Sequence, residues 1–363
     1  MSGVRCTDSS DLRSGYSERE WMRIQAKEEK EQKKQRQLIG MAVILFLISL
    51  LLCFFVYYFV LRSHDYTLTQ PYDKADMVLG IGNTLSSGNV AEPFAGELCV
   101  ANGEVNTQAL SLSAYSAGLF DMNKKQTIYA KDIFTKRGEA SITKIMTALV
   151  TLKYGNLDDI ITVTPIVKDI EYGSSVCDIK EGDVLSLRQL LYGLMIASGN
   201  DAGMMIAEHV GGSVDNFVNM MNEEARQIGA TNTHFTNPHG LTDPDHYTTV
   251  YDIYLMMNAA LEYEIFQDII SRKNYYAEYS RIDGSPVAVT WESTNHYFTN
   301  DADAPDNVTV YGGKTGTTDE AGNCLALLTK DPYGNPYLSI ILHCDSKESL
   351  YAEMNQLLSL IES

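Results

Sequence analysis

The stretch between residues 38 and 60 constrains this chain more than any other feature, because it holds 23 consecutive residues without a charged side chain. A helix rises about 1.5 Å per residue, so a helix of this length crosses a hydrocarbon layer of roughly 30 Å. A buried core helix and a cleaved signal peptide are the alternatives. The apolar run is longer than that of a signal peptide, however, and no Ala-x-Ala site follows it. We therefore expect one uncleaved transmembrane helix at residues 38–60.

The charges on either side of this segment predict its orientation. Residues 1–37 hold nine Lys or Arg against seven Asp or Glu, and the basic residues gather near the apolar segment. Only Arg62 lies close behind it. The positive-inside rule then makes residues 1–37 a cytoplasmic tail and places the rest of the chain outside the cell membrane. A solvated helix and a disordered segment both fit residues 16–37.

The rest of the chain divides into a linker and one large domain. Residues 61–107 are rich in Gly, Ser, Asn and Pro without sustained periodicity, which is typical of an extracellular stalk. Residues 108–363 carry strand and helix patterns throughout. The formal net charge of the whole chain is -19, which argues against nucleic acid as a partner.

The patterns in the large domain predict an α+β fold. Segments typical of strands occur near both of its ends, at 109–130 and 275–343, whereas residues 150–270 are mainly helical in pattern. The last predicted helix, at 346–361, has a single apolar stripe and one lysine. Packing against a sheet therefore suits this helix better than lying on a membrane surface.

Two cysteines flank a predicted β-hairpin near the C-terminus. Its strands are residues 324–328 and 337–343, joined by turn residues at 331–336. Pairing about that turn would bring Cys324 and Cys344 together, and disulfides persist outside the cell. A disulfide and two buried thiols both fit this pattern. No Cys-x-x-Cys pair is present, so the sequence does not support a zinc ribbon or a thioredoxin-type site.

Ser141 and Lys144 are three residues apart in a segment of helical periodicity that Gly155 ends. Positions i and i+3 share one face of a helix, so the Ser141 hydroxyl should lie one turn from the Lys144 amine. The positive end of the helix dipole there favours developing negative charge. This arrangement can activate a serine with a lysine base in place of histidine.

Two later motifs add polar groups to this pair. Ser198-Gly199-Asn200 interrupts two apolar segments of helical pattern. A predicted strand then carries Lys314-Thr315-Gly316 among further glycines and threonines, and glycine in a strand often marks the close approach of another backbone or a ligand.

Ser-x-x-Lys, Ser-x-Asn and Lys-Thr-Gly in this order resemble the signature of penicillin-binding proteins and serine β-lactamases. The surrounding phrases resemble the D-alanyl-D-alanine carboxypeptidase branch over roughly residues 108–363. These phrases are Ala140-Ser141-Ile142-Thr143-Lys144-Ile145-Met146-Thr147, Ala197-Ser198-Gly199-Asn200-Asp201-Ala202, Asn237-Pro238-His239-Gly240-Leu241, His246-Tyr247-Thr248-Thr249 and Gly313-Lys314-Thr315-Gly316-Thr317-Thr318. The resemblance implies a β-lactamase/transpeptidase-like fold, in which helices flank an antiparallel sheet and an all-helical subdomain is inserted at about residues 156–270.

The resemblance also implies catalytic roles for residues at these positions. Ser141 would be the nucleophile and Lys144 would take its proton, which requires that the lysine pKa be lowered. Ser198 would pass the proton to the leaving group, and Asn200 would hydrogen-bond the substrate amide. Lys314 would lower the pKa of Lys144 and attract the terminal carboxylate of the substrate.

The strand of the third motif is implied to bind the substrate through Thr315, Gly316, Thr317 and Thr318. The backbone N–H groups of Ser141 and Thr317 would form the oxyanion hole. Some members of the family carry an arginine beyond the third motif that holds the terminal carboxylate. Here no arginine follows Arg281, so Lys347 or the threonine hydroxyls would serve instead.

The implied activity is removal of the terminal D-alanine from peptidoglycan stem pentapeptides through an acyl-enzyme, with β-lactams as covalent inhibitors and no cofactor. A DD-transpeptidase or endopeptidase, a β-lactamase and a catalytically inactive cell-wall-binding protein remain alternatives. Residues 226–260 contain no glutamate, which argues against a class A β-lactamase. Histidines and aspartates at 234–246 include residue types that bind metals, but that segment resembles a structural loop of the family, so we expect no metal.

Overall fold

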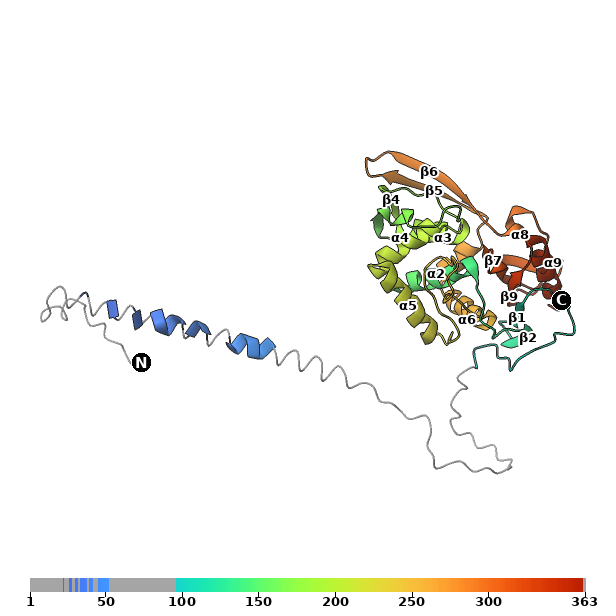
Figure 1. Ribbon diagram of the computed structural model, residues 1–363, viewed down its shortest axis with the longest axis horizontal. Helices are drawn as coiled ribbons and strands as arrows, with labels where there is room; N and C mark the ends of the chain where they lie inside the picture. Colours follow the sequence, from blue (N-terminus) through green and yellow to red (C-terminus); the bar gives the residue numbers. More distant parts are fainter. Residues whose placement is uncertain are drawn as a thin grey trace, which may run out of the picture. The chain divides into compact units, whose positions relative to one another are not determined.

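The computed structural model describes residues 96–361 and parts of the segment before them, namely residues 22, 26–27, 30–31, 33–37, 39–41 and 45–51. The chain divides into two units, Met1–Gly88 and Asn89–Ser363. The second unit contains the labelled strands and helices of Figure 1.

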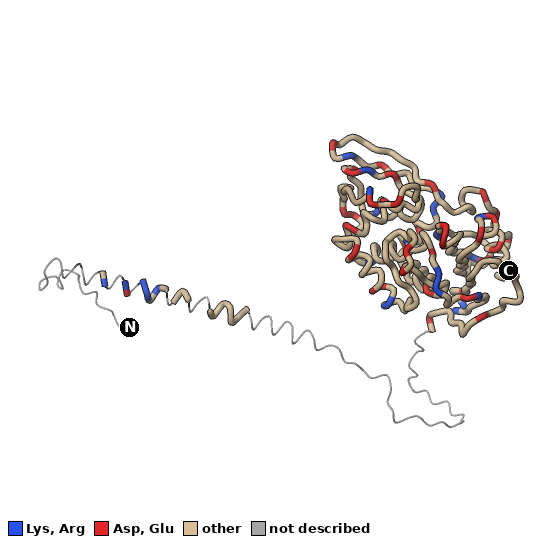
Figure 2. The backbone as a smooth tube through the Cα atoms, viewed as in Figure 1, with Lys and Arg blue, Asp and Glu red and all other residues tan. Residues whose placement is uncertain are grey.

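Among the described residues of the first unit, one helix, Lys33–Leu51, is long and apolar enough to cross a membrane. Figure 2 shows basic residues at the beginning of the described part of this unit and uncharged residues after them. The helix overlaps the anchor expected at 38–60, of which residues 52–60 lie outside the described residues, as do residues 61–95 of the expected stalk. The orientation of the segment across a membrane stays a prediction.

A five-stranded antiparallel sheet forms the centre of the second unit, in the order β2-β1-β9-β8-β7. Its strands are β1 (Ser116–Asp121), β2 (Gln126–Lys131), β7 (Thr309–Thr318), β8 (Gly322–Lys330) and β9 (Pro336–Cys344). The expected hairpins β1–β2 and β8–β9 are confirmed. Strands β8 and β9 are apolar along most of their length because both faces of the sheet are covered.

Helices cover the two faces of this sheet. Helix α9 (Lys347–Leu358) packs on one face, where Met354 and Leu357 contact a core that includes Leu325 and Ile341. The packing expected for the last helix is therefore confirmed. Helix α6 (Val250–Ala260) packs on the opposite face, and the larger core of the unit lies there.

The helices between β2 and β5 begin and end largely at local sequence signals. They are η3 (Ala140–Thr143), α2 (Lys144–Tyr154), η4 (Pro165–Lys168), α3 (Leu187–Ile196), α4 (Asn200–Gly211), α5 (Val214–Gln227), α6 and α7 (Glu264–Ile270), and the short α8 (His296–Thr299) follows later. The side chains of Ser186, Ser213 and Thr249 accept backbone N–H groups at the starts of α3, α5 and α6. Gly212 ends α4 in a left-handed conformation.

A second antiparallel sheet, of order β3-β4-β5-β6, lies next to α3 and α4 in Figure 1. Its strands are β3 (Ile160–Thr162), β4 (Asp183–Ser186), β5 (Asn274–Arg281) and β6 (Pro286–Glu292). The expectation of an all-helical insertion at 156–270 is not confirmed, because β3 and β4 fall inside that range and β4 pairs with β5 beyond it. Short strands whose partner is distant in the chain leave a weak local pattern.

The second unit includes residues that the sequence pattern placed in the stalk. Cys99 is fully buried, and its backbone N–H donates to the Tyr254 hydroxyl at 2.8 Å. Val105 and Ala130 exchange two backbone hydrogen bonds of 2.9 and 3.0 Å at the edge of the first sheet. The boundary expected at residue 107 is therefore too late, because this segment pairs with β2.

Cys324 and Cys344 are two buried free thiols, so the disulfide interpretation is wrong for this structure. A shift in register between β8 and β9 pairs Asn323, and not Cys324, with Cys344. As a result the two side chains point to opposite faces of the sheet. Cys324 belongs to the core beneath the helical region, whereas Cys344 belongs to the core beneath α9.

Candidate active site

Ser141 lies on the 3-10 turn η3, directly before α2, and not on the first turn of an α-helix as expected. The residue before it, Ala140, has a φ of 50°, in the left-handed region that non-glycine residues rarely adopt. Strained residues of this kind persist where the surrounding structure holds them, often at functional sites. The strain therefore marks the turn at residues 139–143 as a place that the fold holds in one geometry. Because this turn carries the predicted nucleophile, we call it the nucleophile turn.

Gly316 on β7 allows the strand to approach this turn closely. A Cβ atom at position 316 would lie 2.6 Å from the carbonyl oxygen of Glu139 and 3.0 Å from the backbone nitrogen of Ser141. Any side chain there would push the strand away from the turn. The glycine of the third motif thus brings the backbone of β7 beside the backbone of the nucleophile.

The amine of Lys144 lies at hydrogen-bond distance from three oxygen atoms. Its Nζ is 2.8 Å from Ser141 Oγ, 2.7 Å from Asn200 Oδ1 and 2.7 Å from the carbonyl oxygen of His239. A neutral amine has two N–H groups and one lone pair. Because the amide and carbonyl oxygens can only accept, they take the two N–H groups, and the lone pair faces the Ser141 hydroxyl.

The surroundings of Lys144 favour this neutral form. The side chain is fully buried, and burial lowers the pKa of Lys144 well below its ordinary range. The positive charge of Lys314 lowers the pKa of Lys144 further. Burial alone lowers the pKa of Lys314 to about 7. The arrangement can therefore supply a lysine that acts as a base.

Lys314 connects the strand of the third motif to the second motif. Its Nζ donates to Ser198 Oγ at 3.0 Å and to the carbonyl oxygen of Thr315 at 2.9 Å. Ser198, between α3 and α4, has a φ of 58°, a second left-handed residue at this site. Through these contacts the structure brings the five predicted catalytic residues together: Ser141, Lys144, Ser198, Asn200 and Lys314.

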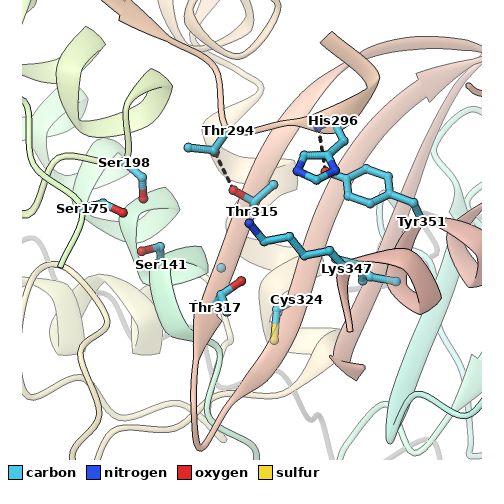
Figure 3. A pocket seen from close by; sticks show the side chains of 12 residues that line it. Ser141, Ser175, Ser198, Thr294, His296, Thr315, Thr317, Cys324, Lys347 and Tyr351 are labelled. Carbon is cyan, nitrogen blue, oxygen red and sulfur yellow. Dashed lines mark hydrogen bonds between the residues drawn. The ribbon is translucent and has the colours of Figure 1, made fainter. Parts of the chain in front are cut away.

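A pocket of about 130 Å³ opens over Ser141. Figure 3 shows Ser141 and Ser198 on one side of it and Thr315 and Thr317 of β7 on the other. Gly316 lines the pocket as well, whereas Thr318 lines neighbouring cavities further along β7. Three of the four predicted substrate-binding residues therefore lie at the pocket.

One end of the pocket is formed by α8 and α9. His296 stacks on Tyr351 with ring centroids 4.8 Å apart, and the His296 backbone N–H donates to the Tyr351 hydroxyl at 2.9 Å. Lys347, on the first turn of α9, extends its amine over β7 toward Thr315 (Figure 3). Unlike Lys144 and Lys314, Lys347 is exposed to solvent. From the sequence we expected Lys347 or the threonine hydroxyls to replace the arginine that some family members carry after the third motif. Lys347 does lie at the pocket.

Sequence reasoning missed three residues that shape the site. The carbonyl oxygen of His239 accepts from Lys144, the carbonyl oxygen of Ser175 accepts from the Asn200 N–H at 2.8 Å, and the hydroxyls of Thr294 and Thr315 are 2.5 Å apart. Two of these contributions come from the backbone, which has no residue-type signal. Ser175 and Thr294 lie in irregular segments without a motif.

The histidines of the loop that includes residues 234–246 serve structural contacts. Burial lowers the pKa of His239 to about 3, so its ring is neutral, and its Nδ1 accepts the backbone N–H of Leu241 at 3.2 Å. Within residues 96–361 and the described parts of the first unit, no three His, Cys, Asp or Glu side chains are grouped to hold a metal ion.

Comparisons with known proteins identify the family to which this chain belongs. A family model described as D-alanyl-D-alanine carboxypeptidase matches residues 103–345. The D-alanyl-D-alanine carboxypeptidase DacF of Bacillus subtilis is 32% identical over 256 residues, which are 68% of this chain and 62% of that protein. The D-alanyl-D-alanine carboxypeptidase DacD of Escherichia coli is 30% identical over 279 residues, which are 74% of this chain and 67% of its own length.

Solved structures give the same result for the fold. The crystal structure of the Streptomyces K15 DD-transpeptidase matches with a TM-score of 0.65 and 28% identity, covering 69% of this chain and 97% of the other. The D-alanyl-D-alanine carboxypeptidase DacD from Francisella tularensis matches with a TM-score of 0.60 and 25% identity, covering 69% and 71%. The expected β-lactamase/transpeptidase-like α+β fold is confirmed, and the chain belongs to the D-alanyl-D-alanine carboxypeptidase family.

Proposed function

We propose that this protein is a serine-type D-Ala-D-Ala carboxypeptidase, which removes the terminal D-alanine from peptidoglycan stem pentapeptides through an acyl-enzyme on Ser141. One observation carries the proposal: Lys144 Nζ lies 2.8 Å from Ser141 Oγ while Asn200 and His239 accept its other N–H groups. This is the geometry of a serine with a neutral amine as its base. The names of the relatives support the choice of substrate.

In the acylation step, Ser141 Oγ attacks the carbonyl carbon between the two D-alanines, and Lys144 Nζ takes the hydroxyl proton. The carbonyl oxygen becomes an oxyanion. The backbone N–H groups of Ser141 and Thr317 stabilise it, because Gly316 lets the two backbones lie close together. Each donor of such a hole is worth about 3–4 kcal/mol.

Collapse of the tetrahedral intermediate breaks the C–N bond and releases D-alanine. Ser198 Oγ passes the proton gained by Lys144 to the leaving nitrogen, and Lys314 orients that hydroxyl at 3.0 Å. A water molecule then attacks the ester carbonyl, and Lys144 takes its proton. As the bond between the carbonyl carbon and Ser141 Oγ breaks, Lys144 returns that proton to Ser141 Oγ. The products are the shortened peptide and free Ser141.

The substrate is held by the open edge of β7 and by lysines. Strand β7 is an edge strand of the five-stranded sheet, so an extended peptide can pair with its free edge. Thr315, Gly316 and Thr317 lie where such a peptide passes Ser141, and Thr318 continues the edge beyond the pocket. Lys314 and Lys347 attract the terminal carboxylate from below and from the rim of the pocket.

The cellular context follows from the apolar helix of the first unit. The tail at 1–37 lies in the cytoplasm, the helix anchors the chain in the cell membrane, and the catalytic unit acts on the outer side. Support comes from the helix Lys33–Leu51 and from cell-wall enzymes among the relatives. β-Lactams, whose strained amide presents a carbonyl to the same serine, are covalent inhibitors in this scheme.

DD-transpeptidation is the second candidate function. Proteins of Streptomyces K15 appear in the comparisons as a D-alanyl-D-alanine carboxypeptidase and as a DD-transpeptidase. Water and an acceptor amine attack the same acyl-enzyme, so the groups around Ser141 serve both reactions. The acceptor decides between them.

A labelled-penicillin experiment on the purified full-length chain tests the enzyme proposal. Wild type should form a covalent adduct that survives denaturing electrophoresis, and Ser141→Ala should not, with circular dichroism confirming that both are folded. Absence of label on folded wild-type protein would overturn the proposal in favour of a catalytically inactive binding protein.

A second experiment separates hydrolysis, transfer and β-lactam turnover. A peptide ending in D-Ala-D-Ala is incubated with and without an amine acceptor, and the products are resolved by mass. Loss of one D-alanine supports the carboxypeptidase, whereas a peptide joined to the acceptor supports the transpeptidase. Rapid release of the penicilloyl group with no peptide cleavage would indicate a β-lactamase.

A further inference from the structure

A buried acid–base pair lies directly behind the nucleophile turn. Glu139 is 1% exposed and His246 is 6% exposed, and Glu139 Oε1 lies 3.0 Å from His246 Nε2. Thr143, at the other end of the turn, places its Oγ1 2.9 Å from Glu139 Oε1 and 2.8 Å from His246 Nε2. The pair therefore contacts the turn at both ends, and the proposed reaction uses neither residue.

The hydrogen bonds around His246 define its tautomer. Its Nδ1 accepts the backbone N–H of Thr236 at 3.1 Å, so in the neutral ring the proton is on Nε2. Nε2 then donates toward Glu139 and Thr143. A hydrogen bond to a carboxylate is stronger than one between neutral groups. His246 thus connects its own loop to the nucleophile turn through the contact between its Nε2 and Glu139 Oε1.

The loop that His246 holds, residues 236–248, contains the carbonyl that orients Lys144. His239 O accepts from Lys144 Nζ at 2.7 Å. Next to it, Gly240 has a φ of 88°, and a Cβ atom there would lie 1.9 Å from the carbonyl oxygen of Ala140. A shift of this loop would therefore move both the strained residue before Ser141 and the acceptor of the base.

Stability alone gives a weak reason for this pair. Glu139 Oε2 is buried without a hydrogen-bond partner in the part of the chain that the structure describes, which is costly. Replacing both partners of a buried hydrogen bond by apolar groups of the same shape can be nearly neutral or stabilising. The contacts of the pair with both ends of the turn, and with the loop that supplies the His239 carbonyl, instead point to a role in geometry.

We propose that Glu139 and His246 are positioning residues that join the loop 236–248 to the nucleophile turn and so hold Ser141 Oγ and Lys144 Nζ in reacting geometry. The inference rests on the proposed acylation of Ser141. Positioning of this kind has large kinetic effects, since a displacement of about 1 Å can lower a rate about a hundredfold.

The test compares single-turnover acylation of the full-length chain by labelled penicillin. Glu139→Ala and His246→Ala should each lower the acylation rate constant about a hundredfold. The dissociation constant of the non-covalent complex should change little, because neither side chain reaches the ligand. The double variant should be no slower than the slower single variant, since the two residues act as one unit.

Two conservative variants and one matched control separate positioning from folding. Glu139→Gln keeps the shape of the side chain, and His246→Gln keeps an N–H near Nε2, so both should recover part of the rate. The control is Glu224→Gln, which removes another buried carboxylate, 2% exposed and 2.8 Å from Lys153 Nζ. Its melting temperature should fall while its acylation rate stays at the wild-type value.

The results distinguish this inference from the proposed function. An unlabelled wild type would overturn the proposed function, and with it this inference. A labelled wild type together with Glu139 and His246 variants that acylate at the wild-type rate would overturn the positioning inference alone. The positioning inference would also be overturned if the acylation rate of each variant fell only in proportion to the fraction of protein that is unfolded. If the alanine variants do not fold, the two glutamine variants must still acylate more slowly than wild type.

Discussion

The two walls of the catalytic pocket each contain one buried lysine, and the two lysines differ in their surroundings. Lys144, at the start of α2, lies within 2.8 Å of three oxygens, from Ser141, Asn200 and His239. Lys314, in β7, contacts Ser198 Oγ and the adjacent carbonyl. Burial lowers the pKa of both amines. Repulsion from the other lysine lowers the pKa of Lys144 as well, whereas burial alone lowers that of Lys314.

Because of this difference, we assign proton transfer to the wall that contains Lys144 (the helical wall) and electrostatic support to the wall that contains Lys314 (the sheet wall). In the proposed reaction, the helical wall supplies the nucleophile and the base, and the lone pair of that base has one direction because its other contacts are acceptors. In the same proposal, the sheet wall supplies an amine whose charge lowers the pKa of that base, together with an open strand edge for a peptide. Lys347, which is exposed at the rim, adds charge without burial. Substitutions of the three lysines should therefore have effects of different kinds and decreasing size.

The largest effect is expected from Lys144→Met, which keeps the bulk of the side chain and removes the base. The acylation rate of Ser141 by labelled penicillin should fall about a thousandfold, because general-base catalysis contributes about 10²–10⁴-fold. Gel time courses measure the rate, and circular dichroism checks the fold. A folded variant with nearly full activity would mean that the base is not in the helical wall.

A smaller effect, with a change in pH dependence, is expected from Lys314→Met. Lys314 lowers the pKa of Lys144, so its removal should raise that pKa. Only the neutral form of Lys144 accepts a proton, and a higher pKa means that the neutral form is reached at higher pH. The acidic limb of the acylation profile should therefore move to higher pH.

Acylation rates between roughly pH 5 and pH 11 measure this shift, because that range spans ordinary and lowered lysine pKa values. The KM for a D-Ala-D-Ala peptide should also rise, since a cation near the carboxylate is lost. An acidic limb that stays in place, or moves to lower pH, would contradict the electrostatic role of the sheet wall.

The smallest effect is expected from Lys347→Gln at the rim. Exposed ion pairs contribute about 0–1 kcal/mol, so the KM for the peptide should rise no more than about fivefold while kcat is unchanged. The difference from wild type should shrink as salt is added. Lys124→Gln, at the turn between β1 and β2, is a matched control that should leave KM unchanged. An equal rise in KM in both variants would show that Lys347 does not bind the substrate carboxylate.

The residues that meet at the candidate site were predictable from the sequence because their motifs are local and ordered. Ser186 and Thr249 begin helices through their own side chains, and Gly212 ends one, so helix boundaries were also predictable. The pairing of β3 with β4 and of β4 with β5 was missed, because β3 and β4 are short and β5 is far along the chain.

By itself, then, the sequence determined the apolar helix near the N-terminus, the α+β class, the family and the ordered motifs of the predicted site, since each depends on local pattern or residue type. Only the tertiary structure decided that the His239 carbonyl holds Lys144 and that Glu139 meets His246 behind the nucleophile. It also decided that Cys324 and Cys344 face opposite sides of one sheet. The reason is physical: backbone acceptors, strand register and contacts between distant segments are set by how the chain packs, and no local pattern records them.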